Sequence, residues 1–357
     1  MFLSVSTLYA ALALASVGSA SPVQLTKRYP NAITTDAPFS QSDAQFAQFP
    51  PICPYGVSKS SPEKNILFIP GTGESGDNAF AKGYVPALKA QGYFPCYTNL
   101  PNVSLSDAQV TSEYVVKQID SVYSQAGNKP FTISAHSQGN LNVQWGLNFW
   151  PSRRNKIRNF VGLAPDFHGT AEGQLVLAAQ YALIHGGAPS VIQQSVILGK
   201  PSNFLNALNK HANQPLVPTT ALYGDFDEII QPVASTTTLD NTPVPNSFAH
   251  IDLSLICAGR TAAIVDHFRT LLSAPAFWLI LDALRNGGIA NVNRARLLAL
   301  SQRQDFCADL VPGAADDSVP QLAKTAFMAA LEVGSNDFLT QTTDREPELK
   351  PYAANQP

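Results

Sequence analysis

The stretch FTISAHSQGN (131–140) places Ser137 between a predicted strand and a predicted helix. The strand is FTIS (131–134), and the helix LNVQWGLNF (141–149) repeats large apolar residues every fourth position. A serine at such a junction is typical of the nucleophile elbow G-x-S-x-G, in which small residues let the strand and helix backbones approach closely. Ala135 stands where the first glycine of that motif would be. We therefore predict that Ser137 is a nucleophile.

A serine hydroxyl is a weak nucleophile, so it needs a base that accepts its proton and an acid that orients the base. In hydrolases with this elbow the chain order is serine, acid, histidine. His267 follows a predicted strand, HIDLSLI (250–256), and a short loop, so it is the expected base. His250, at the head of that strand, is the main alternative and is more typical of a structural residue.

Candidates for the acid follow the predicted strand TTALYGD (219–225). Asp225, Asp227 and Glu228 lie at its end or just beyond it, and Asp166 lies one predicted strand earlier. Spacing alone does not separate Asp225 from Asp227.

Stabilisation of a tetrahedral oxyanion requires two or three hydrogen-bond donors. We expect one from the backbone N–H of Gln138 and another from the glycine-rich loop PGTGESG (70–76), where Thr72 can add its hydroxyl. This loop is not a phosphate-binding loop, because no G-K-S/T follows it. The chain also has no C-x-x-C or H-x-x-x-H spacing, so we expect neither a metal nor an organic cofactor.

The alternation of strand-like and helix-like segments predicts an α/β fold: a mostly parallel central sheet with helices on both faces. The segments outside the elbow are strands at NILFIP (65–70) and NFVGLAPD (159–166) and a helix over 106–127. We expect one catalytic domain over 29–335, after an irregular start, and a loose polar tail over 336–357.

The 357-residue chain has a formal net charge of −3 with no strongly one-signed half, which gives no reason to expect a nucleic-acid partner. The basic run RRNKIR (153–158) is interpreted as the solvated end of a helix. The apolar residues 1–20 end in small residues and predict a secretory signal, and 21–28 form a pro-segment that ends at a dibasic site. No later run reaches the length of a transmembrane anchor.

Four cysteines in an oxidising compartment predict two disulfides, with three possible pairings: Cys53, Cys96, Cys257 and Cys307. Asn102 begins the only N-x-S/T sequon and is a candidate for glycosylation. Together with the signal, these features predict a secreted, extracellular protein, and we expect a monomer.

The quoted segments resemble the Candida antarctica lipase B-like family of fungal lipases, which are α/β-hydrolases. The similarity runs in order over roughly 40–335 and is carried by FIPGTGESG, GYFPCY, SAHSQGN, LAPDFHGT, APSVIQQ, VPTTALYGDFDEIIQP and IVDHF. It implies an acid at Asp227, a base at His267, and oxyanion donors at Thr72 and Gln138. It also implies the disulfides Cys53–Cys96 and Cys257–Cys307.

By the same resemblance, Asp166 and Gln194 match polar residues of the acyl pocket, and Ile229 matches its wall. His136 replaces a tryptophan that shapes the alcohol side of the pocket, so the alcohol selectivity does not carry over. The segment 171–187 looks longer than the family's lid-like helix. Its apolar residues could cover the cleft as a lid or pack as core, and the lid is the interpretation that we favour. The implied function is hydrolysis of lipid esters, possible at an oil–water interface. The alternative is a carboxylesterase or polyester hydrolase that acts on shorter esters, and a less favoured one is a non-catalytic secreted binding protein.

Overall fold

The computed structural model describes residues 32–173, 187–314, 320–321, 324–325 and 343–356. The predicted signal (1–20), the pro-segment (21–28) and most of the expected lid (174–186) lie outside these residues. None of the helices within the described ranges is long and apolar enough to cross a bilayer.

Six strands form the central sheet in the order β2-β1-β3-β4-β7-β8, and every neighbouring pair is parallel. The predicted mostly parallel sheet is therefore confirmed. The strands are β1 (Asn65–Ile69), β2 (Phe94–Tyr97), β3 (Phe131–His136), β4 (Ile157–Leu163), β7 (Thr219–Tyr223) and β8 (Phe248–Asp252). A separate hairpin joins β5 (Val196–Ile197) and β6 (Lys200–Pro201).

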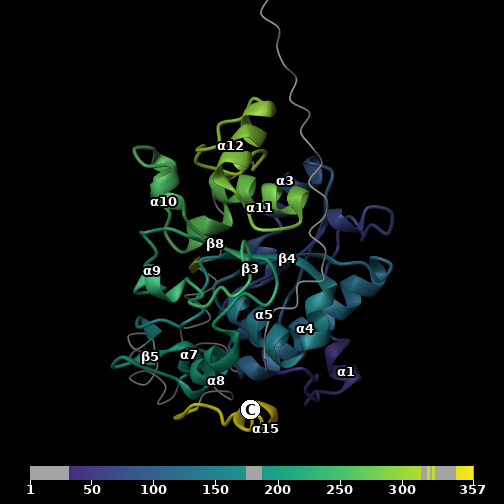
Figure 1. Cartoon of the computed structure of the whole chain (residues 1–357), viewed down its shortest axis with the longest axis vertical. Helices are drawn as coiled ribbons and strands as arrows, with labels where there is room; N and C mark the ends of the chain where they lie inside the picture. Colours follow the sequence, from purple (N-terminus) through teal and green to yellow (C-terminus); the bar gives the residue numbers. More distant parts are fainter. Residues whose placement is uncertain (1–31, 174–186, 315–319, 322–323, 326–342, 357) are drawn as a thin grey trace, which may run out of the picture.

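Helices cover both faces of the sheet (Figure 1). One layer holds α3 (Tyr84–Ala90), α11 (Ala274–Asn286) and α12 (Val292–Ser301), and the other holds α4 (Ala108–Gln125), α5 (Gln138–Phe149) and α8 (Asn203–Ala212). Strand β1 shows why two cores form. Successive side chains of a strand point to opposite faces, so Ile66 and Phe68 join one apolar cluster while Leu67 and Ile69 join the other.

Shorter elements connect these layers. They are α1 (Asp43–Phe46), α2 (Gly76–Ala79), α7 (Pro189–Gln194), α9 (Val233–Thr236), α10 (Leu253–Ile256), α15 (Pro351–Ala354) and the 3₁₀ turns η1 (Pro62–Lys64), η2 (Pro101–Ser104), η3 (Pro151–Lys156), η4 (Thr261–Ala263) and η5 (Phe268–Leu271).

Two expectations from the sequence are wrong in detail. The predicted strand over 250–256 ends at Asp252, because the Asp252 carboxylate accepts the backbone N–H groups of Ser254 and Leu255 and so begins helix α10. The basic run over 153–158 is not simply solvated. Arg153 pairs with Asp36 and Asp120.

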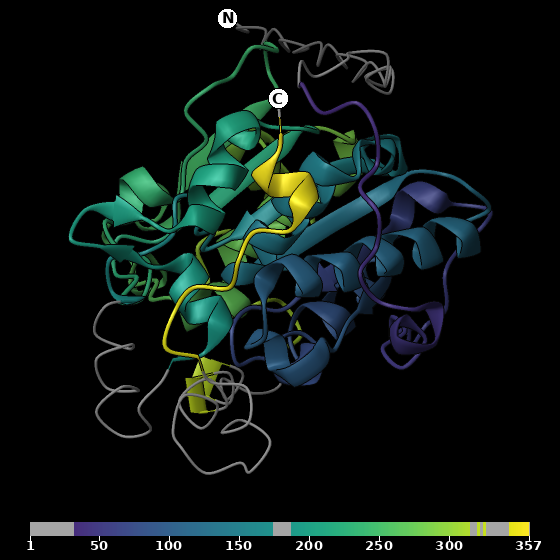
Figure 2. The same cartoon turned by 90° about the horizontal axis from the view of Figure 1, so that it is seen from below.

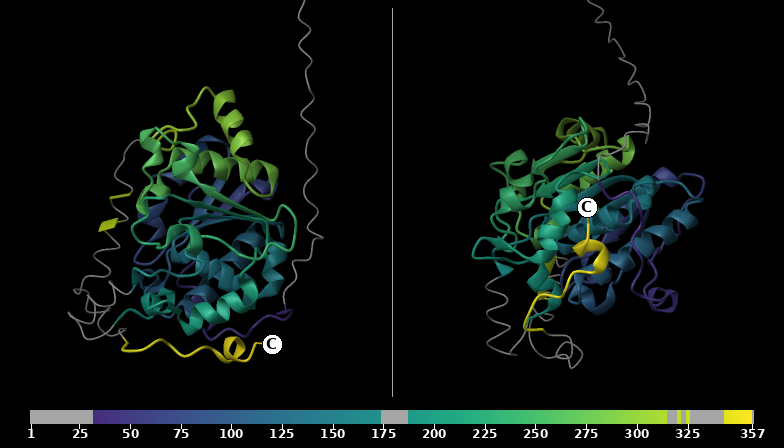
Figure 3. Two further views of the ribbon diagram at one scale, coloured as in Figure 1. Left: turned by 60° about the vertical axis from the view of Figure 1, so that its left-hand side comes forward. Right: turned by 60° about the horizontal axis from the view of Figure 1, so that its bottom comes forward.

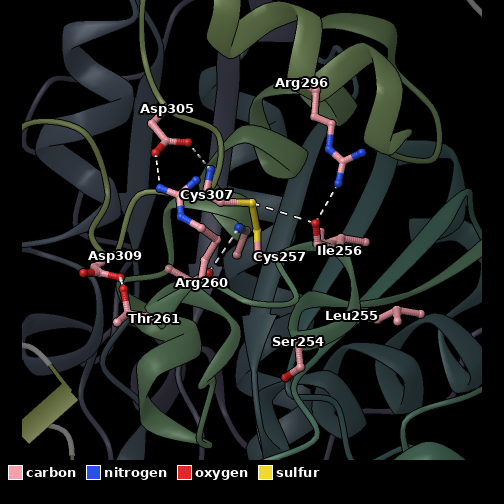
Figure 4. Close-up of a disulfide and its surroundings, with 12 residues drawn as sticks. Ser254, Leu255, Ile256, Cys257, Arg260, Thr261, Arg296, Asp305, Cys307 and Asp309 are labelled. Carbon is pink, nitrogen blue, oxygen red and sulfur yellow. Dashed lines mark hydrogen bonds and ion pairs between the residues drawn. A yellow bond between two sulfur atoms is a disulfide. The ribbon is translucent and has the colours of Figure 1, made fainter.

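The two disulfides join Cys53 to Cys96 and Cys257 to Cys307, which are the pairings that the resemblance implied. Figure 4 shows the second one at the end of α10. Beside it, Arg260 donates to Asp305 at 2.5 Å and Arg296 donates to the Ile256 carbonyl at 2.6 Å. These contacts join the segment that leads towards His267 to α12 and to the chain that follows it.

The expectation of a loose tail is also wrong for residues 343–356, which lie along α5 and α8 (yellow in Figures 2 and 3). The Tyr352 ring contacts Trp145, Phe149 and Trp150 at centroid distances of 6.4, 5.1 and 5.4 Å. The Glu346 carboxylate accepts the first backbone N–H groups of α8. The polar composition of this segment therefore gave no indication that Tyr352 packs in an aromatic cluster or that Glu346 caps a helix.

We expect Tyr352→Ala to lower the free energy of unfolding by about 2 kcal/mol, because it removes an aromatic ring from a packed cluster. Tyr352→Phe is the matched control. It loses only the 3.3 Å contact with the indole N–H of Trp145 and should cost less than about 1 kcal/mol. Denaturant titration measures both, and equal stability of the three proteins would show that the C-terminal segment does not contribute.

Candidate active site

The predicted elbow is formed at the carboxyl end of β3. Ser137 has φ of +52° and ψ of −132°, a strained conformation for a residue other than glycine. Its backbone N–H donates to the Leu163 carbonyl at 3.0 Å. A Cβ at Gly139 would lie 2.6 Å from the Ile69 carbonyl oxygen, so only glycine lets α5 start this close to the end of β1. The turn projects Ser137 from the edge of the sheet.

His267 is oriented by Asp227. The ring Nδ1 of His267 lies 2.8 Å from Oδ2 of Asp227, and both side chains are buried. The other oxygen, Oδ1, accepts the backbone N–H groups of Ile229 and Ile230 at 2.9 and 2.8 Å. With Nδ1–H donated to the carboxylate, Nε2 is the ring atom that can accept a proton. Asp225 is exposed and does not contact His267 in the described part of the chain.

The charge of His267 is set by opposing effects. Burial by itself lowers the pKa of the imidazole, but Asp227, with additional contributions from Glu74 and Glu228, raises it to about 9. The site therefore favours the imidazolium, which is the form that the base takes when it has removed the serine proton.

The main chain of His267 is also held. Its N–H donates to Oε2 of Glu228 at 3.1 Å. Its carbonyl accepts the Thr270 hydroxyl at 2.7 Å and lies 3.1 Å from Nε2 of His136. Among the described residues, no hydrogen bond joins the Ser137 hydroxyl to the His267 ring, and such contacts often tighten only when substrate binds.

The expected oxyanion residues lie together beside Ser137. The Thr72 hydroxyl donates to Oε1 of Gln138 at 2.5 Å, and Nε2 of Gln194 lies 3.0 Å from each of these two oxygens. Gln138 is the first residue of α5, so its backbone N–H has no acceptor within the helix and lies at the positive end of the helix dipole. This arrangement suits a developing negative charge.

A cavity with about 430 Å³ of empty space, including its open mouth, lies next to Ser137. The residues that line it are Thr72, Ser137, Thr170, Glu172, Gly173, Val191, Gln194, Ile229 and Ile230. Of the four residues expected at the substrate pocket, Gln194 and Ile229 line this cavity, whereas Asp166 and His136 are fully buried and do not line it. The sequence analysis missed Thr170, Val191 and Ile230, which no local motif distinguishes from core residues.

Asp166 is a buried carboxyl group without a side-chain partner. Apart from its own backbone amide, neither carboxyl oxygen has a hydrogen-bond partner among the described residues. Burial raises its pKa to about 7, and the nearby charge of Asp227 also raises it while His267 lowers it. Asp166 can therefore remain protonated close to neutral pH.

Two further carboxylates lie near His267: Glu74, for which the sequence suggested no role, and Glu228, which was a candidate for the acid. Glu74 lies in the glycine-rich loop and pairs with His136, and Glu228 holds the main chain of His267. A charged residue inside a glycine-rich loop after a buried strand was the available signal for Glu74. Within the described ranges, no cluster of three His, Cys, Asp or Glu side chains could hold a metal ion.

We expect Glu228→Gln to shift the acidic limb of the kcat/KM profile to lower pH by roughly 0.3–1 unit, because it removes a charge that favours the imidazolium of His267. In the wild type that limb should rise through the His267 pKa of about 9. The Gln amide oxygen can still accept the His267 N–H. Unchanged limbs in initial-rate measurements from pH 5 to 10 would contradict this assignment.

Asp166→Asn tests the unpaired carboxyl group. The folded-state pKa of Asp166 lies above its ordinary value of 3.8, so the wild type loses stability relative to the variant as the pH rises from about 4 to about 7. The difference in unfolding free energy should change by about 2–4 kcal/mol over that window, since one pKa unit is about 1.4 kcal/mol. Denaturant titrations at pH 4.5 and pH 8 measure it, and a constant difference would show that Asp166 does not titrate there.

Comparisons with known proteins show which family shares this sequence and fold. Lipase B of Pseudozyma antarctica is 33% identical over 343 residues, which span 95% of this chain and 92% of that protein. The crystal structure of Aspergillus fumigatus lipase B matches with a TM-score of 0.75 at 25% identity, over 94% of this chain and 76% of that one. No family model matches the sequence. The identity over nearly the full length, on the same fold, shows that this chain belongs to the lipase B family of α/β-hydrolases and is a carboxylic ester hydrolase.

Proposed function

We propose that this protein is a secreted lipase that cleaves carboxylic esters of lipids through an acyl-enzyme, with Ser137, His267 and Asp227 as its catalytic triad. The observation that carries the proposal is the buried 2.8 Å contact between His267 and Asp227, in a chain that also places Ser137 on a strained strand–helix turn. Support for secretion comes from the apolar segment 1–20 and the two disulfides.

In the proposed mechanism Ser137 Oγ attacks the ester carbonyl while Nε2 of His267 takes its proton. The oxyanion of the tetrahedral intermediate accepts hydrogen bonds from Thr72 and from the backbone N–H of Gln138. Collapse of the intermediate breaks the bond to the alcohol, which receives the proton from His267. Water then attacks the acyl-enzyme with the same proton relay, and the carboxylic acid and the serine hydroxyl are released.

The cavity favours an apolar acyl chain. Val191, Ile229 and Ile230 supply aliphatic walls close to Ser137, and none of the described residues that line the cavity is basic. An anionic substrate would lose its hydration there without a partner of opposite charge. We infer that the enzyme acts as a monomer on lipid esters at an oil–water interface. Hydrolysis of shorter, dissolved esters is the alternative, because the chain that follows the lining residue Gly173 lies outside the described part.

Hydrolysis of p-nitrophenyl esters from two to sixteen carbons tests the proposal. We expect Ser137→Ala to lower kcat by about 10⁶-fold at every chain length, because removal of the nucleophile from a triad enzyme lowers kcat by about that factor. Among the esters that wild type cleaves, a maximum at eight carbons or more supports a lipase, and a maximum at two to four carbons supports an esterase of short substrates.

A well-folded wild type that is as inactive as the variant would contradict the mechanism. That result would favour a non-catalytic binding protein on a hydrolase scaffold, and circular dichroism of both proteins controls for folding.

A further inference from the structure

His136 precedes the nucleophile but does not face the cavity. Its side chain is fully buried, and both ring nitrogens have partners. Nδ1 lies 2.9 Å from Oε1 and 3.0 Å from Oε2 of Glu74, and Nε2 lies 3.1 Å from the carbonyl oxygen of His267. The rings of His136 and His267 have centroids 4.6 Å apart. The residue before the nucleophile therefore contacts the residue that carries the base.

The proton positions of this network follow from its acceptors. A carbonyl oxygen can only accept, so Nε2 of His136 must carry a hydrogen that is donated to His267. Burial alone would raise the pKa of Glu74, but the ion pair with His136 and the backbone N–H of Gly71 hold it below its usual range. Glu74 is then a carboxylate, which can only accept, so Nδ1 of His136 donates to it.

Glu74 also connects this pair to the oxyanion loop. Its Oε2 accepts the Gly71 N–H at 2.9 Å, next to Thr72. One chain of hydrogen bonds thus runs from the loop after β1, through His136 at the end of β3, to the main chain of His267. A buried ion pair is seldom the most stabilising way to fill a core, so stability alone does not account for it.

We propose that Glu74 and His136 are positioning residues of the ester hydrolysis: His136 holds the His267 carbonyl, and Glu74 holds His136 and the oxyanion loop in register with it. This inference rests on the proposed function. Neither residue has to touch the substrate, because the pair acts through the placement of the base. Displacement of a base by about 1 Å can cost on the order of 100-fold in rate.

Three variants of similar shape distinguish the hydrogen bond between His136 and Glu74 from the one between His136 and His267. In His136→Asn the amide nitrogen can occupy the position of Nδ1, which keeps the bond to Glu74 and loses the bond to His267. In His136→Gln the amide nitrogen can occupy the position of Nε2, which keeps the bond to His267 and leaves the Glu74 carboxylate without a side-chain donor. Glu74→Gln keeps every contact, because the new amide can accept from Gly71 and donate to Nδ1 of a neutral His136.

The measurements are kcat and KM for p-nitrophenyl butyrate and the melting temperature of each protein, with folded enzyme counted by covalent titration of Ser137 with a phosphonate. We expect His136→Asn to lower kcat by roughly 10–100-fold with KM changed less than about twofold. His136→Gln and Glu74→Gln should keep kcat within about threefold when it is compared on the pH-independent plateau, since loss of the Glu74 charge also lowers the His267 pKa. His136→Gln should nevertheless melt at a lower temperature than His136→Asn, because it leaves the buried Glu74 carboxylate without the side-chain donor that His136→Asn retains.

The positioning role thus predicts that turnover and stability rank the two His136 variants in opposite orders. The inference is overturned if His136→Asn turns over like the wild type, if kcat follows melting temperature across the series, or if Glu74→Gln loses more than tenfold. Should His136→Gln not fold, the double variant with Glu74→Gln, which removes the unpaired charge, takes its place. Failure of the proposed function looks different, since wild type and Ser137→Ala would then be equally inactive.

Discussion

The close approach of α5 to the end of β1 is the constraint on which the site depends. Gly139 permits it, because any side chain there would meet the Ile69 carbonyl. The approach forces a strained turn at Ser137 and places the first backbone N–H of α5 beside the loop that carries Thr72. The proposed nucleophile and oxyanion donors are therefore brought together by one close backbone contact, in which β1 and β3 are neighbours in the sheet.

Three buried carboxyl groups lie around this turn, and their surroundings give them different hydrogen-bond partners and different roles. Asp227 is a carboxylate held by two backbone N–H groups and His267, and Glu74 is a carboxylate held by His136 and Gly71. Asp166 has no such partner, so burial raises its pKa to about 7. The same functional group thus supplies an orienting charge, an internal tether and a neutral acid within one site.

Contacts outside the site support the loops that carry it. The disulfide Cys257–Cys307 and the pair Arg260–Asp305 restrain the chain shortly before the base. On the far side of α5, Tyr352 packs against its aromatic residues. Catalytic groups need placement within a fraction of an ångström, and a helix and a loop that are anchored at both ends can provide it.

The sequence by itself determined the features encoded within about ten residues: the buried strands, the helix after Ser137, and the elbow between them. It also indicated a parallel sheet, because strands and helices alternate. Only the tertiary structure showed that Asp227, and not Asp225, contacts His267. It also showed that β8 ends at Asp252 and that the polar C-terminal segment packs against the domain. It also paired Glu74 with His136 across 62 positions. The physical reason is that periodicity and turn chemistry are local, whereas hydrogen-bond partners and burial depend on which loops the sheet order brings to the same edge.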